Sequence, residues 1–374
     1  MNVLLDFVAN HVHMEHPYYK AHPDVATDLY LPDGSLNTER WDDHRLTTWF
    51  DTHMPSLRLD DPDVYEMLTD SAVFWIEEYG FDGFRHDATK HVPEIFWKVL
   101  TRKLKDRVIS TGKPLFQIGE TYGSRELVAS YLGSGKLDAQ FDFNLYDACL
   151  ASLANPEGSM TILDNAVKAG LESFGHHHLM GNITGNQDRG RFISYAGGAL
   201  RFDEDAKAAG WTREVGVGDP VAYEKSKQLF AVISTIPGIP VVYYADEIGD
   251  YGGNDPDNRK MMRFDELESK EKELKRIASY LIGLRGEFLP LIYGDFRTHL
   301  VDESGYIYSR NYLDQTALIL LNGSKEPRTF SFQLDKDQVD LSDGNPFLTD
   351  GLDRDSLGTY SITLPSNAFE IITR

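Results

Sequence analysis

The chain has 374 residues, 41% of them hydrophobic and 12% aromatic, which suffices for a large domain plus a smaller one and excludes a disordered chain. Its 37 Lys and Arg residues against 59 Asp and Glu residues give a formal net charge of −22, which argues against nucleic acid or an anionic membrane as a partner. The single cysteine, Cys149, excludes an internal disulfide, and no run of about eighteen apolar residues predicts a membrane span.

The chain opens on a predicted buried strand, whose apolar residues lead into Asp6-Phe-Val-Ala-Asn-His11. Residues 12–60 follow with little periodicity and many His, Pro, Asp and Trp residues, which is typical of a long loop excursion with a function. Four aromatic side chains in and around this excursion could stack on sugar rings or simply pack: Tyr18, Trp41, Trp49 and Phe50.

Asp61-Pro62 and Gly80 predict the start and the stop of a helix, and a short apolar strand comes next. This strand ends in Arg85-His-Asp87. Because side chains alternate across a strand, Arg85 and Asp87 share one face, where the guanidinium keeps the carboxylate ionised. The pair has two readings, a structural ion pair or a nucleophile held ready for reaction.

Strands and helices then alternate, which indicates βα units and a parallel sheet. The strand at 115–119 ends in Glu120, and the strand at 180–185 leads to Asn186-Gln-Asp188. Further strands are predicted at 139–143 and 240–244, and helices at 93–108, from 124, 145–174, 222–234 and 267–284. After residue 290, short alternating runs between Asn, Gly and Asp turns predict an antiparallel sandwich.

Five segments, in this order, resemble the motifs of the α-amylase family of glycoside hydrolases: DFVANH at 6–11, GFRHDATKH at 83–91, the strand ending in Glu120, Asn186-Gln-Asp188, and Gly238-Ile-Pro-Val-Val-Tyr-Tyr-Ala-Asp-Glu247. The resemblance covers nearly the whole chain. It implies an α/β fold, a (β/α)8-type barrel with a loop-rich inserted subdomain and a C-terminal antiparallel β-sandwich, and an active site where the strands end.

The resemblance also assigns the domains. Residues 1–11 and 61–287 form the barrel, 12–60 the inserted substrate-covering subdomain, and 288–374 the β-sandwich. The first strand corresponds to the third of the family, so the barrel is expected to be incomplete at the N-terminus. Six strands leave two open edges. We expect a missing N-terminal segment or a second chain to complete the barrel.

By the same resemblance, Asp87 is the nucleophile, Glu120 the acid/base, and Asp188 the carboxylate that stabilises the transition state. Glycoside cleavage requires two carboxyl groups, and a separation of about 5–5.5 Å gives retention of configuration, the outcome we predict. Seven side chains are expected to contact the sugars or orient these carboxylates: His11, Arg85, Lys90, His91, Tyr122, Gln187 and Arg259.

Two positions depart from the family pattern. Gln187 stands where the family usually has His, and an amide donates a hydrogen bond but never becomes a cation. Ser56, in Met54-Pro-Ser-Leu57, stands where many α-amylases have a calcium-binding aspartate; neopullulanases and cyclomaltodextrinases share this departure. Asn10 and the His91 carbonyl would remain as calcium ligands, few for an ion that prefers six to eight oxygens. No cofactor is expected to be required.

Two further segments could be taken for ligand-binding sites. Adjacent histidines such as His176-His-His178 on an irregular segment rarely converge on one metal ion, so a loop is expected there. Gly252-Gly-Asn-Asp-Pro-Asp257 is expected to form a substrate-cleft loop leading to Arg259, or a plain turn.

These observations predict a retaining hydrolase that cleaves α-1,4-glucosidic bonds of starch, maltodextrin or cyclodextrin, with an α-glucan oligosaccharide or polysaccharide as its partner. The alternative is a catalytically silent α-glucan-binding or interaction protein on the same scaffold. A non-functional fragment is the third reading.

Overall fold

The computed structural model describes residues 1–334, 339–349 and 351–374. The chain divides into two compact units, Met1–Phe141 and Asp142–Arg374, which are described one at a time. In the described part of the chain, every helix is too short or too polar to cross a lipid bilayer. The domain boundaries expected from the sequence stay a prediction.

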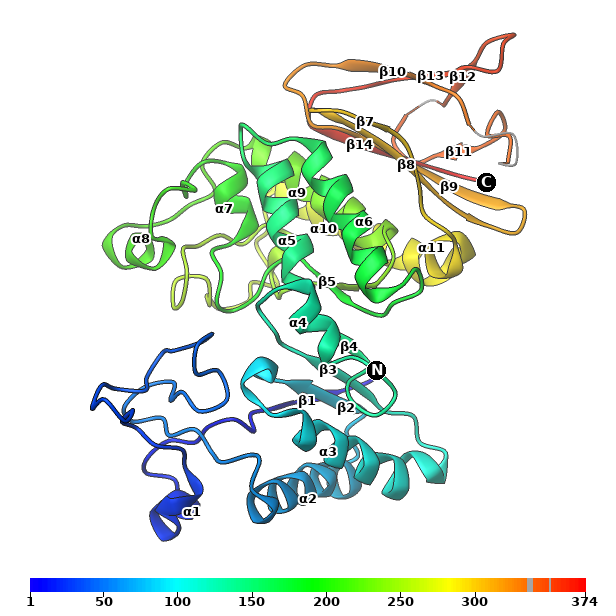
Figure 1. Ribbon diagram of the computed structural model, residues 1–374. Helices are drawn as coiled ribbons and strands as arrows, with labels where there is room; N and C mark the ends of the chain where they lie inside the picture. The colour runs from blue at the N-terminus through cyan, green and yellow to red at the C-terminus, as the bar shows by residue number, and fades with distance from the viewer. Residues whose placement is uncertain (335–338, 350) are drawn as a thin grey trace. The chain divides into compact units, whose positions relative to one another are not determined.

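The first unit is built on a four-stranded parallel sheet in the order β1-β2-β3-β4 (Figure 1). Its strands are β1 (Leu4–Phe7), β2 (Gly83–His86), β3 (Phe116–Gly119) and β4 (Ala139–Gln140). All four were predicted from the apolar runs, but the prediction that the first strand is buried was wrong, because the residues of β1 alternate between exposed and partly buried positions at the edge of the sheet. Since β1 and β2 pair with Asp6 opposite Arg85, and β2 and β3 pair with His86 opposite Gly119, the polar residues that follow these strands emerge at one edge.

Helices connect these strands, as the alternating pattern predicts: α2 (Pro62–Tyr79), α3 (Glu94–Arg107) and α4 (Arg125–Ser130), with the shorter η2 (Thr89–His91) and η3 (Ile109–Thr111). The side chain of Asp61 caps the first turn of α2 by accepting from the Asp63 N–H, and Gly80 ends the helix with a left-handed φ of 75°. A fully buried cluster that includes Phe84, Phe96 and Trp97 forms the core between the sheet and these helices.

Gly83 permits the close pairing of β2 with β3. Its φ is 150°, and a Cβ atom added there would lie 1.8 Å from the Phe116 carbonyl oxygen. No side chain fits in that space, so any other residue would push the two strands apart.

Residues 12–60 contain only the short α1 (Pro17–Ala21) and η1 (Pro23–Val25), as expected of an excursion. Isolated backbone bridges hold it together, among them His11 with Ser56 and Thr38 with Trp49. Trp49 is buried and donates from its indole to the Thr27 carbonyl, 2.9 Å away, so this aromatic residue is part of the packing.

The second unit contains a parallel pair of strands, β5 (Gly181–Ile183) and β6 (Ile239–Val241). Its longer helices are α6 (Met160–Phe174), α9 (Val221–Thr235) and α10 (Ser269–Glu287), and its shorter ones are α5 (Phe143–Cys149), α7 (Phe192–Ala196), α8 (Ala206–Thr212), η5 (Asp246–Ile248) and α11 (Leu289–Tyr293). Cys149 is buried at the end of α5.

One helix prediction was wrong in this unit. The helical pattern over 145–174 is interrupted, because α5 passes into a π-helix, η4 (Leu150–Ala154), and α6 begins only at Met160. Pro156 and Gly158 lie in the break, and a Cβ atom on Gly158 would meet the Ala151 carbonyl oxygen at 2.4 Å. Proline and glycine stop a helix even where the apolar spacing continues.

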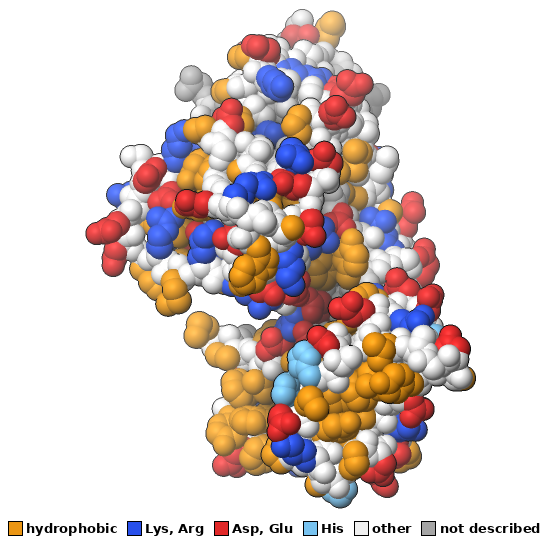
Figure 2. All heavy atoms as spheres, turned by 90° about the vertical axis from the view of Figure 1, so that its left-hand side faces the viewer, with side chains coloured by type: hydrophobic (Ala, Val, Ile, Leu, Met, Phe, Trp, Pro, Cys, Tyr) orange, Lys and Arg blue, Asp and Glu red, His pale blue; other side chains and the backbone are white. Residues whose placement is uncertain are grey.

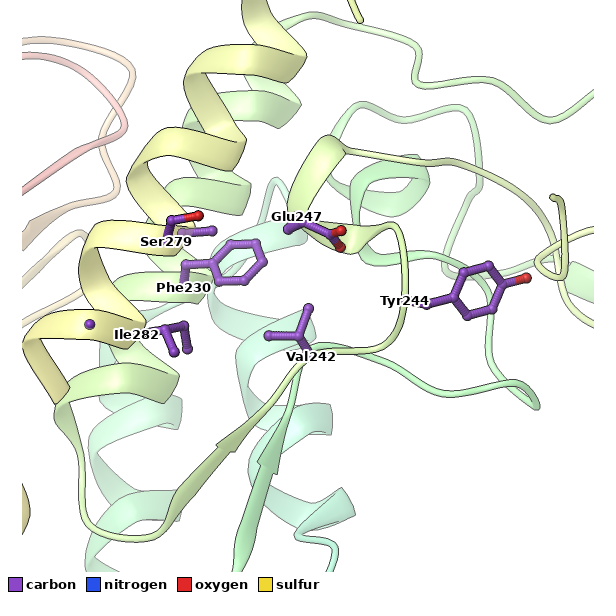
Figure 3. A pocket seen from close by; sticks show the side chains of 8 residues that line it. Phe230, Val242, Tyr244, Glu247, Ser279 and Ile282 are labelled. Carbon is purple, nitrogen blue, oxygen red and sulfur yellow. The ribbon is translucent and has the colours of Figure 1, made fainter. Parts of the chain in front are cut away.

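A cavity of about 620 Å³ opens beside β6 (Figure 3). Val242 and Tyr244, which follow β6, and Glu247 in η5 line one side, while Phe230 of α9 and Ile282 of α10 line the other. In the part of the chain that the structure describes, β6 pairs only with β5, and β1 pairs only with β2. Among the described residues β4 likewise pairs only with β3, so β1 and β4 are the edge strands of the first unit's sheet, and β5 and β6 are both edge strands of the second unit's parallel pair.

The C-terminal part is an antiparallel two-sheet domain, as predicted. One sheet has the order β11-β14-β9-β8-β7 and the other β10-β13-β12. The strands are β7 (Arg297–Val301), β8 (Gly305–Tyr312), β9 (Gln315–Asn322), β10 (Arg328–Phe332), β11 (Asn345–Pro346), β12 (Asp353–Arg354), β13 (Tyr360–Leu364) and β14 (Ala368–Thr373). Alternate residues of these strands, such as Leu318, Leu320, Phe330 and Ile362, form the core between the sheets.

Candidate functional site

Arg85 links three carboxylates at the ends of neighbouring parallel strands. Its Nη1 lies 2.7 Å from Asp6 Oδ1 and 2.8 Å from Asp87 Oδ1, and its Nη2 donates to Glu120. The side chains of Arg85, Asp87 and Glu120 are only 16%, 21% and 15% exposed. Two of the three predicted catalytic carboxylates therefore lie on one guanidinium in the first unit.

The charge of Arg85 is secured by these neighbours. Burial by itself lowers the pKa of Arg85, but the carboxylate of Glu120, followed by those of Asp6 and Asp87, outweighs burial and raises the pKa overall. Arg85 is thus a permanent cation, and its planar fork fixes where two carboxylates lie relative to each other. Asp6 was not predicted as a site residue, although its place opposite Arg85 in a parallel pair is a signal that register would have supplied.

Thr89 ties the segment after β2 to the end of β3. Its N–H donates to the Glu120 carbonyl at 2.9 Å, and its hydroxyl accepts from the Glu120 N–H at 3.0 Å. Between Asp87 and Thr89, Ala88 has a left-handed φ of 47°, which turns the chain sharply after the strand. A non-glycine residue in this conformation stores strain of the kind found at functional sites. The backbone of Glu120 is therefore held from both sides.

His11 lies at the edge of the same cluster and stacks on Phe50, with ring centroids 4.3 Å apart. Burial lowers the pKa of His11, although the charge of Asp87 opposes the shift. Its Nδ1 is buried without a hydrogen-bond partner among the described residues. Phe50 of the excursion therefore braces a neutral imidazole beside the carboxylates.

His91 is held in one tautomer. Its Nδ1 lies 2.7 Å from the Arg45 carbonyl oxygen, which only accepts, so Nδ1 carries the proton and Nε2 is left as an acceptor. Burial lowers the pKa of His91 to about 4. Trp41 and Phe50 both pack against this ring, with centroids 5.4 Å and 5.2 Å away.

The two remaining predicted residues of this unit differ in exposure. The Lys90 side chain is 12% exposed and its Nζ lies 3.2 Å from Asp42 Oδ1. The Lys90 carbonyl accepts from Arg45 and from the Tyr131 hydroxyl, so its backbone is fixed. Tyr122 is 53% exposed just beyond Glu120. Its ring has room to meet a ligand.

The predicted residues of the second unit also come together. Asp188 Oδ2 accepts from the Gln187 amide at 3.0 Å, and Asp188 Oδ1 lies 3.0 Å from Arg259 Nη2. Arg259 also donates from Nε to the Gln187 carbonyl at 3.1 Å, which ties the 252–259 loop to the loop after β5. Asn258 adds a further bond at 2.7 Å to the Arg189 carbonyl. The loop after β6 thus supports the carboxylate that follows β5.

A buried ion pair that sequence reasoning missed lies beneath these loops. Arg191 Nη1 lies 2.7 Å from Asp246 Oδ1, and Arg191 donates to the Tyr244 carbonyl at 2.6 Å and to the Asn258 carbonyl at 2.8 Å. Burial raises the pKa of Asp246, although Arg191 opposes the shift. The sequence carries two signals for this pair: a second arginine two residues after Arg189, and an acidic residue shortly after the strand predicted at 240–244.

The residues at the expected calcium position do not fit that ion. Asn10 is buried and donates to the Ser56 hydroxyl at 3.3 Å, and Ser56 donates in turn to the Thr48 carbonyl at 2.6 Å. A hydroxyl occupied within the protein replaces the carboxylate that calcium prefers. In the described ranges, no group of three or more His, Cys, Asp or Glu side chains is arranged to hold a metal, the run of three histidines included.

Comparison with known proteins gives the same family throughout. The sequence model described as "Alpha amylase, catalytic domain" matches residues 1–279. A cyclomaltodextrinase of Geobacillus thermopakistaniensis is 27% identical over 382 residues, which cover 99% of this chain and 58% of that protein. The chain spans about half the length of the curated relatives it matches.

Two solved structures share the fold over the full chain. The Anoxybacillus α-amylase matches with a TM-score of 0.82 and 26% identity, covering 100% of this chain and 75% of that one. The α-amylase from Geobacillus thermoleovorans, complexed with acarbose, matches with a TM-score of 0.81 and 28% identity, covering 100% and 77%. The family model covers three quarters of this chain, and the strand-end carboxylates, the parallel sheets and the antiparallel C-terminal domain agree with it. The chain therefore belongs to the α-amylase catalytic-domain family.

Proposed function

We propose that this chain is the catalytic part of a retaining glycosidase that cleaves α-1,4-glucosidic bonds of starch, maltodextrin or cyclodextrin. The observation that carries the proposal is the single guanidinium of Arg85, which holds Asp87 and Glu120 together at the ends of adjacent strands. Two carboxyl groups held close together are what a double-displacement mechanism needs.

In the first step Glu120 gives its proton to the glycosidic oxygen while Asp87 attacks the anomeric carbon. The glycosidic bond breaks, and an ester between Asp87 and the sugar forms. In the second step Glu120, now a carboxylate, takes a proton from water, and the water oxygen displaces Asp87. Arg85 orients Asp87 for the attack through its hydrogen bond to Oδ1, 2.8 Å away. Asp188, with Gln187 and Arg259, is proposed to bind sugar hydroxyls and stabilise the transition state.

The test measures reducing-sugar release from maltoheptaose. Asp87→Asn and Glu120→Gln should each lower the rate by at least about 1,000-fold, since each removes a chemical participant. Glu126→Gln, the same substitution on an exposed position of α4, is the matched control and should keep the rate. Turnover that is equal in the wild type and in Glu120→Gln would refute the assignment.

A second candidate function, a silent α-glucan-binding protein, is favoured by Gln187. Its amide donates to Asp188, and it cannot supply the cation that a histidine at this position would. Saturable maltooligosaccharide binding without any Glu120-dependent turnover would support this alternative.

The open edges of β1 and β6 support one more proposal, that a further segment or a second chain completes the barrel. Leu4 and Val8 are 36% and 47% exposed beside the β1 edge, and Phe74 and Tyr79 of α2 are 48% and 60% exposed. Hydrophobic side chains also gather on the face of the N-terminal unit that Figure 2 shows. Binding of such a segment should cover this surface. A hydrophobic dye should then bind less to the complex than to the chain alone.

A further inference from the structure

A second cavity lies within the C-terminal unit, at the end of the sheet where β5 and β6 begin. It has a volume of about 540 Å³ and is separate from Asp188, which follows the other end of β5. The residues that line it come from the loops before β5 and β6, from the start of β6, and from α10, α11 and β8. Those that matter below are His176, His177, His178, Arg285, Arg310 and Tyr293.

Two guanidinium groups line this cavity without a carboxylate. Arg310 is 1% exposed and donates to the carbonyl oxygens of Asp295 at 2.7 Å, Thr235 at 2.7 Å and Gly294 at 2.9 Å. Arg285 donates to the carbonyls of Ile236 at 2.8 Å and of Gly238. Both arginines thus bind the backbone around the C-terminal end of α9. No carboxylate of the described residues forms an ion pair with either guanidinium.

The charges in this cavity repel one another. Burial, together with the charge of Arg285, lowers the pKa of Arg310 to about 9, although the charge of Asp295 opposes this shift, and burial lowers the pKa of Arg285 to about 10, so both stay cationic at neutral pH. Burial and the same two arginines lower the pKa of His178 to about 4. A buried cation that no carboxylate contacts directly costs free energy, which a bound anion would offset. Such a site contrasts with the net charge of −22 on the whole chain.

The walls of the cavity are apolar apart from these groups. Pro237, Ile239, Pro240 and Ile292 contribute to them, and Tyr293 is 54% exposed at the rim. The volume exceeds what an inorganic anion fills, and apolar walls around a few polar groups are typical of sites for organic ligands. Planar guanidinium forks match the oxygens of phosphate.

We propose that this cavity binds a small organic phosphate, with its phosphate on Arg285 and Arg310 and its ring or apolar body against Ile239, Ile292 and Tyr293. The exposed imidazoles of His176 and His177 stand at the entrance and can donate to the phosphate oxygens. The site is remote in the fold from the loops after β5 and β6, and its occupancy does not depend on the glycosidase activity proposed above.

The test is isothermal titration calorimetry of the full chain with phenyl phosphate, inorganic phosphate and phenol at one ionic strength set with NaCl. Phenyl phosphate should bind saturably at one site, inorganic phosphate at least about tenfold more weakly because it lacks the apolar body, and phenol not at all. Equal affinity for the two phosphates, or no saturable heat with phenyl phosphate, would overturn the proposal.

Variants locate the site. Arg285→Gln should weaken phenyl phosphate at least about tenfold, since one charged hydrogen-bond donor group is lost. Arg276→Gln is the matched control, because Arg276 is exposed on the same helix nine residues earlier and should leave affinity unchanged. Arg285 also supports the end of α9, so His177→Gln, at an exposed position, is the second variant and should weaken binding about threefold with the thermal melt unchanged. Wild-type affinity in both Arg285→Gln and His177→Gln would refute the assignment.

Discussion

Replacing Arg85 with lysine tests whether one planar cation organises the carboxylates. Lysine keeps the charge, but its ammonium is a single nitrogen and cannot reproduce the two fixed positions from which Arg85 holds Asp87 through one nitrogen and Glu120 through the other. The magnitude follows from exposure. The Asp6 contact involves a side chain that is 64% exposed and contributes about 0–1 kcal/mol. Contacts to the largely buried Asp87 and Glu120 contribute about 1.5–3 kcal/mol each.

Arg85→Lys should therefore lose one of the two inner contacts and lower the free energy of unfolding by about 1.5–3 kcal/mol. The carboxylate that is released moves, and a displacement of about 1 Å should lower the rate on maltoheptaose about 100-fold with KM little changed. The assays are urea denaturation and reducing-sugar release on the same preparations.

Arg107→Lys is the control for this substitution. Arg107 of α3 binds both oxygens of one carboxylate, that of Glu77 of α2, through Nε and Nη2, and the two side chains are 45% and 38% exposed. Its loss should cost about 0–1 kcal/mol and leave the rate unchanged. If Arg85→Lys behaves like Arg107→Lys in both assays, the guanidinium does not organise the site and the reasoning fails.

Three further predictions concern the scaffold. Gly83→Ala should destabilise the first unit by more than about 3 kcal/mol in urea denaturation, because the new Cβ would lie 1.8 Å from the Phe116 carbonyl oxygen; Gly135→Ala, with open space around it and no left-handed φ, should cost no more than about 1 kcal/mol. Burial lowers the pKa of His86 from 6.5 to about 4, so the unfolded chain takes up a proton at a higher pH than the folded chain does. The free energy of unfolding should therefore fall by about 3 kcal/mol as the pH drops from 6.5 to about 4. His86→Gln should flatten that part of the pH profile, and an unchanged slope would contradict the assignment. Asp246→Asn removes the nearer of the two carboxylates at Arg191, leaving Asp250 at 3.7 Å, and should cost about 1.5–3 kcal/mol in guanidinium denaturation, whereas a loss under about 1 kcal/mol would show that Asp250 and the backbone carbonyls suffice for Arg191.

The parallel strands were predictable because their apolar runs are short and end abruptly in charge. Arg85 and Asp87 were placed on one face by alternation alone, and their atoms lie 2.8 Å apart. The start and stop of α2 were equally readable, since Asp61, Pro62 and Gly80 each act within one turn of the helix. Side-chain alternation and helix-end signals involve residues close together in the sequence, so both can be recognised without a structure.

Contacts between distant segments were not predictable in the same way. Asp6 joins the cluster because β1 pairs with β2 in one particular register, and no local pattern states that register. The π-helix after α5 and the Arg191–Asp246 pair also depend on packing between segments far apart in the chain. The sequence likewise did not show that the Ser56 hydroxyl is already bonded to Asn10 and Thr48, because these residues are not neighbours in the chain.

Nearly every side of α9 is covered. Only Val221, Glu224 and Lys225 escape burial, and Gln228 donates to the carbonyls of Asn322 and Ala368 at 2.9 Å each, two strands of the antiparallel domain. A chain shortened to end at Glu287 would expose one apolar side of this helix to water and leave the Gln228 amide without these two acceptors. The residues after Glu287 thus enclose one side of α9, and exchanging them between relatives would require exchanging α9 as well.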